Sequence, residues 1–199
     1  MTKLELAKNE LSEALKLFLE DRDPISYFLL AFASHEIIKN IANGKEVKSI
    51  LKDDLPTKIN EAGFDIAMSN HYGKEYKKYI KKNAKSKVGF FVDYDYNKSK
   101  HGGSDPDEEV TIHWGVAEII MVDSIEMLRL IGEKLRVEYF AYIMWVQKTQ
   151  PDIYLNENLE KVLKAFENIY GSVTKDNLGK FVSGAEGNLW EDFINKYSL

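Results

Sequence analysis

The chain has 199 residues, 44% of them hydrophobic and 30% charged, with a formal net charge of −5. These values fit a globular protein with a sizeable core and argue against a general nucleic-acid binder, which usually carries excess positive charge. The absence of cysteine excludes disulfides, thiolate metal ligands and thiol nucleophiles.

Membrane insertion is not expected. No stretch reaches the roughly 18 consecutive apolar residues that a membrane-spanning helix needs. The first residues, Met1 to Glu5, are charged and contain no apolar signal core. We therefore expect no membrane partner and a cytoplasmic location.

Two helices are predicted near the N-terminus, over residues 2–21 and from Pro24 to about residue 43. The first has apolar residues at helical spacing and charged residues on its other face. Asp23 suits an N-cap, Pro24 suits the first helical position, and Gly44 suits the C-terminal end. The second helix is apolar on every face from Tyr27 to Ala33, as expected for a helix in the middle of a bundle.

His35 and Glu36 follow this apolar section directly. In one interpretation the helix emerges toward solvent, with His35 hydrogen-bonded and Glu36 exposed. In the other, one of the two side chains faces a polar pocket between helices, where it would need a partner because an unpaired buried polar group costs several kcal/mol.

The segment from residue 71 to 100 is strongly basic, with seven lysines between Lys74 and Lys87 and tyrosines interleaved. It could face nucleic acid, with lysines on phosphates and tyrosines stacked on bases. The alternative is a solvated helix face. The chain has only three arginines, which favours the solvated face because nucleic-acid readers often use the arginine fork.

The densest group of polar residues is the central stretch from Tyr96 to Glu109, which contains Asn97, Lys98, Lys100, His101 and Asp105. In a helix reaching His101, Asn97 would lie one turn earlier on the same face. Gly102 and Gly103 would end this helix, and an acidic Asp-Pro turn would follow. We take this stretch as the first candidate for a functional site.

A long apolar helix is predicted from Gly115 to Glu133, with Asp123 in its middle. Asp123 could point outward and share a sector with Glu118 and Glu126, which we favour slightly. If it points inward, an imidazolium or lysine from the central stretch would be its natural partner.

The remaining pattern predicts helices over residues 135–150, 156–170, 174–183 and 188–197, the third of these after Gly171. The fold class is thus all-α. We expect a main helical bundle over residues 1–150 and a C-terminal helical extension, packed on the bundle, over residues 151–199.

Familiar catalytic motifs are absent from the sequence. There is no His-Glu-x-x-His zinc motif, phosphate-binding glycine loop, dinucleotide fingerprint or Gly-x-Ser-x-Gly turn. We expect no cofactor and no metal, although His101 and Asp105 leave a single divalent ion as a minor alternative.

The segment from Tyr96 to Gly102 resembles the terminal motif of HEPN-type helical bundles, in which an arginine precedes a histidine by four to six residues. That resemblance implies an up-down helical core, a homodimer and, in active members, metal-independent RNA cleavage. The chain also resembles a group of uncharacterised bacterial helical proteins over roughly residues 3–150. The matching residues are Asp23-Pro24, Glu36, Lys100-His101, Asp105-Pro106 and Asp123.

The chain departs from the HEPN motif at one position, because Tyr96 stands where active members have arginine. Cleavage would need an acid or base and a cation that stabilises the transition state. His101 could be the acid or base, with Asn97 orienting the phosphate or the imidazole. Lys98 and Lys100 would bind phosphate, but a lysine does not reproduce a bidentate guanidinium.

A non-catalytic module that binds a protein partner or a small ligand is the favoured hypothesis, and the ribonuclease is the alternative. In such a module Asn97, Lys100 and His101 would be polar caps and cross-links to Glu36 and Asp123. A homodimer and an RNA or protein partner are compatible with both.

Overall fold

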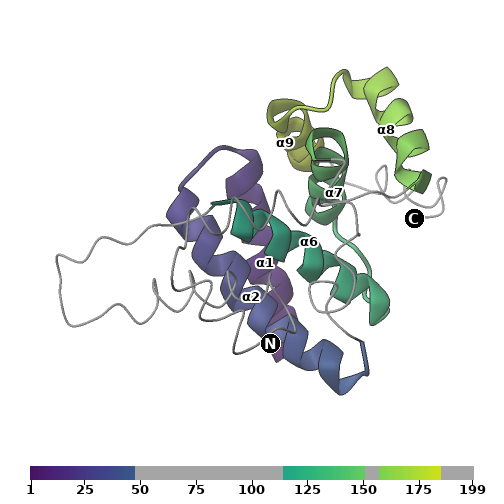
Figure 1. Ribbon diagram of the computed structural model, residues 1–199. Coiled ribbons are helices and arrows are strands. Elements are labelled where there is room, and N and C mark those ends of the chain that lie inside the picture. Colours follow the sequence, from purple (N-terminus) through teal and green to yellow (C-terminus); the bar gives the residue numbers. More distant parts are fainter. Residues whose placement is uncertain (48–113, 151–156, 185–199) are drawn as a thin grey trace, which may run out of the picture.

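The computed structural model describes residues 1–47, 114–150 and 157–184, and this part of the chain is all-helical, with six helices and no strand (Figure 1). The all-α prediction is therefore confirmed. The predicted helix that reaches His101 and the predicted helix over residues 188–197 lie outside the described residues. None of the described helices is both long enough and apolar enough to cross a membrane. The six helices are α1 (Lys3–Leu19), α2 (Pro24–Gly44), α6 (Trp114–Leu130), α7 (Val137–Thr149), α8 (Glu157–Tyr170) and α9 (Lys175–Gly184).

Side-chain caps start the first two helices. The Thr2 hydroxyl accepts a hydrogen bond from the Glu5 backbone amide at 3.1 Å, and the Glu5 carboxylate accepts one from the Thr2 amide at 2.6 Å. Asp23 caps α2 by accepting from the Ser26 amide at 3.2 Å, and Pro24 occupies the first turn, as predicted. The C-cap of α2 is Lys45, so the helix includes Gly44 instead of ending before it.

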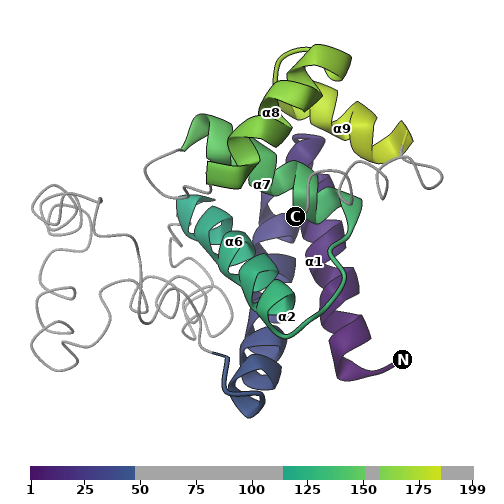
Figure 2. The same cartoon turned by 90° about the vertical axis from the view of Figure 1, so that its right-hand side faces the viewer.

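Helices α1, α2 and α6 pack around one core. In both views α1 lies along α2, and α6 packs against α2 (Figures 1 and 2). The buried side chains are mainly aliphatic and aromatic, and their burial is the main favourable contribution to folding. Those that are fully buried include Leu11 and Leu15 of α1, Phe28 and Ile38 of α2, and Ile120, Met121 and Ile125 of α6.

A glycine turn ends α6. Gly132 has a φ of +84°, a left-handed conformation that glycine adopts without strain. The backbone amide of Glu133 bonds to the Leu128 carbonyl at 3.0 Å, which closes the last turn. The helix therefore ends at Leu130, three residues before the predicted end. The Glu133 carboxylate then pairs with Lys8 Nζ of α1 at 2.7 Å.

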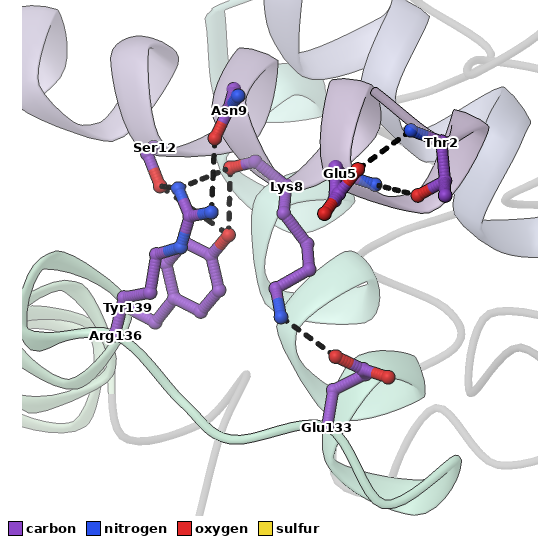
Figure 3. Close-up of polar contacts among 8 residues, drawn as sticks. All are labelled: Thr2, Glu5, Lys8, Asn9, Ser12, Glu133, Arg136 and Tyr139. Carbon is purple, nitrogen blue, oxygen red and sulfur yellow. Dashed lines mark hydrogen bonds and ion pairs between the residues drawn. The ribbon is translucent and has the colours of Figure 1, made fainter.

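Polar contacts join α7 to α1 (Figure 3). The Arg136 guanidinium, just before α7, donates to the Lys8 carbonyl at 3.3 Å, to Asn9 Oδ1 at 2.9 Å and to Ser12 Oγ at 2.8 Å. The Tyr139 hydroxyl donates to the same Lys8 carbonyl at 2.8 Å. One arginine thus connects the start of α7 to two turns of α1.

Helices α8 and α9 lie beside α7 at one end of the molecule (Figures 1 and 2). Gly171, with a φ of +83°, follows α8 directly, at the predicted position. Phe181 of α9 contacts two rings of α8, with centroid distances of 5.4 Å to Phe166 and 5.3 Å to Tyr170. Lys148 of α7 pairs with Glu167 of α8 at 2.9 Å. The predicted division into a main bundle over residues 1–150 and a C-terminal extension over residues 151–199 stays a prediction.

The α1–α7 joint can be tested by replacing Arg136 with alanine. The change removes three hydrogen bonds from a charged donor, so we expect the free energy of unfolding to fall by about 2 kcal/mol in urea titrations. Arg22→Ala is the matched control, since Arg22 pairs with Glu20 while its side chain is 69% exposed. That control should change stability by less than about 0.5 kcal/mol, and equal losses in both variants would contradict a structural role for Arg136.

Candidate functional site

A histidine and a carboxylate meet in the buried contact between α2 and α6. His35 Nε2 and Asp123 Oδ2 are 2.7 Å apart, and the two side chains are 5% and 0% exposed. The residues are 88 positions apart in the chain. Since a buried polar group without a partner costs several kcal/mol, the bond explains how both residues can occupy the core.

The flanking hydroxyls are satisfied within their own helices and do not compete for this pair. Ser34 Oγ donates to the Ala31 carbonyl at 2.9 Å. Ser124 Oγ donates to the Ile120 carbonyl at 2.8 Å. Both serines are buried, and each lies next to one member of the pair.

The structure decides between the alternatives left open for these residues. His35 is buried between α2 and α6 and bonded to a partner there, as the second interpretation predicted, whereas the exposure of Glu36 fits the first. The slight preference for an outward Asp123 is wrong, because every residue of α6 from Met121 to Leu128 is buried. Glu126, expected in the same outward sector, is also buried and bonds to Arg129 at 2.8 Å.

Of the predicted site residues, the structure brings His35 and Asp123 into contact, and Glu36, which follows His35 in the chain, is exposed on α2. Among the described residues, the partner of Asp123 is His35 of α2, and a partner from the central stretch stays a prediction. The other candidates lie outside the described residues, namely Asn97, Lys98, Lys100, His101 and Asp105. Their proximity to the pair stays a prediction.

The pair suits a structural role better than a catalytic one. A carboxylate on one ring nitrogen fixes the orientation and the tautomer of an imidazole, as it does in many active sites. Here, however, the imidazole is 5% exposed and the carboxylate is fully buried, which leaves little room for a substrate. Within the described ranges, no group of three or more His, Asp or Glu side chains is arranged to hold a metal ion.

A second polar group, around Glu118 of α6, was missed by the sequence analysis. The Glu118 carboxylate accepts a hydrogen bond from Gln150 Nε2 at 2.6 Å, and its backbone carbonyl accepts one from the Tyr142 hydroxyl at 2.9 Å. Burial raises the pKa of Glu118, while the Gln150 bond and the charge of Lys175 oppose this shift. No local signal predicts the group, because its partners belong to other segments of the chain.

Comparison with protein-family models, with curated proteins and with solved structures gave no match. The function proposed below therefore depends on the sequence and on the geometry of the described helices. The HEPN resemblance stays a prediction.

Removing either member of the His35–Asp123 pair should destabilise the bundle strongly. His35→Ala or Asp123→Ala leaves the other polar group buried, so we expect each to lower the free energy of unfolding by about 3–5 kcal/mol. The double variant should lose less than the sum of the two, with a coupling energy of about 1–3 kcal/mol. Urea unfolding of the wild type, the two single variants and the double variant measures this coupling energy.

Asn40→Ala is the control for the pair, because Asn40 is exposed on the same helix. It should change stability by less than about 0.5 kcal/mol. Additive losses for His35 and Asp123 would show that the two residues act independently and would contradict the cross-link.

The stability of the protein should depend on Glu118 in the acid range. Because the folded pKa is raised, Glu118 contributes stability that is present below its unfolded pKa and lost as pH rises through the folded pKa. Glu118→Gln keeps an acceptor for Gln150 and does not titrate. Relative to wild type, this variant should therefore gain stability between about pH 3 and about pH 7, as measured by urea unfolding at each pH.

Asp23→Asn provides a control with the opposite sign. Hydrogen bonds from Ser26 lower the pKa of Asp23, so its contribution is present at higher pH and lost as pH falls through the folded pKa. The asparagine variant should lose stability relative to wild type as pH rises. The same trend in both variants would contradict the environment assigned to Glu118.

Proposed function

We propose that this chain is a non-catalytic, HEPN-like helical module that binds a protein partner or a second copy of itself. The observation that carries the proposal is the buried bond between His35 and Asp123. Two polar residues that the sequence marks as site candidates are used to join α2 to α6. In that position they stabilise a packing arrangement and offer no open surface to a substrate.

The described surface supports binding of a protein. Large apolar side chains remain exposed on the described helices, and at two places they occur in pairs. Ile25 and Leu29, one turn apart on α2, are 54% and 42% exposed. Ile169 and Tyr170, at the end of α8, are 64% and 43% exposed. Burial of such side chains against a partner would be favourable at roughly 25 cal/mol per Å² of apolar surface.

A metal-independent ribonuclease is the second candidate function. The observation that favours it is the four-residue spacing of Asn97 and His101, with Lys98 and Lys100 between them, which would put Asn97 and His101 on one face of a helix. His101 would act as acid or base, and the lysines would bind phosphate. In that case the His35–Asp123 pair would hold the bundle that supports the site.

An RNA cleavage assay separates the two functions. We expect the wild type and His101→Ala to give the same background cleavage of mixed RNA, because a binding module has no chemistry for His101 to perform. Gel electrophoresis of the RNA products gives the activity. Light scattering of the same protein fractions gives their mass and thus the oligomeric state. Chelator should leave the background unchanged.

Cleavage by wild type at least about tenfold faster than by a folded His101→Ala would overturn the non-catalytic proposal and support the ribonuclease; this ratio corresponds to about 1.4 kcal/mol of transition-state stabilisation. Cleavage that chelator abolishes would point instead to metal-dependent chemistry.

A further inference from the structure

We draw no further inference here: the strongest candidate, the surface patch of Ile25 and Leu29 on the outer face of α2, is an unpartnered apolar helix face, and nothing in the structure shows what covers it.

Discussion

The bond between His35 and Asp123 constrains how α2 and α6 pack. Apolar contacts favour burial but have no direction, so many relative rotations of two apolar helices bury similar surface. A buried histidine and a buried aspartate are different, because each needs the other at hydrogen-bonding distance. Rotating α6 by one residue would carry the carboxylate away from the imidazole and break this bond inside the core. The bond therefore specifies one packing among several that are similarly apolar.

Phe18, near the end of α1, similarly fixes how the second half of the chain packs on the N-terminal helices. Phe18 contacts Tyr27, Tyr142 and Trp145, which come from α2 and α7, and its face also meets the Lys175 ammonium. Together with the hydrogen bonds of Arg136 to α1, these contacts attach α7 and α9 to the N-terminal helices α1 and α2. At each joint a single cation contacts its partners. Arg136 donates hydrogen bonds to acceptors on α1, and Lys175 lies over the packed Phe18 ring. Their strength therefore depends on charge and on burial at the same time.

Several local features were predictable from the sequence. The starts of α1 and α2, the roles of Asp23 and Pro24 and the end of α8 before Gly171 depend on hydrogen bonds between residues at most a few positions apart. The end of α6 was predicted three residues too late, because the apolar pattern continues to Ile131 while Gly132 already turns the backbone. Of the candidate site, the exposure of Glu36 and the burial of His35 between helices were each predicted, but by different alternatives. The side of the helix that Asp123 faces was not.

For the part of the chain that the structure describes, the sequence by itself determined the all-helical class and most helix boundaries, since periodicity and capping are local properties. It also determined which residue types could carry chemistry. Only the tertiary structure decided that Asp123 turns inward to His35, 88 residues away. It also decided that the Lys175 ammonium lies over the rings of Phe18 and Trp145. An apolar helix such as α6 has no continuous polar face to show its orientation, so Asp123 takes the direction in which its partner lies. That partner is supplied by the packing of distant segments, which no local pattern records.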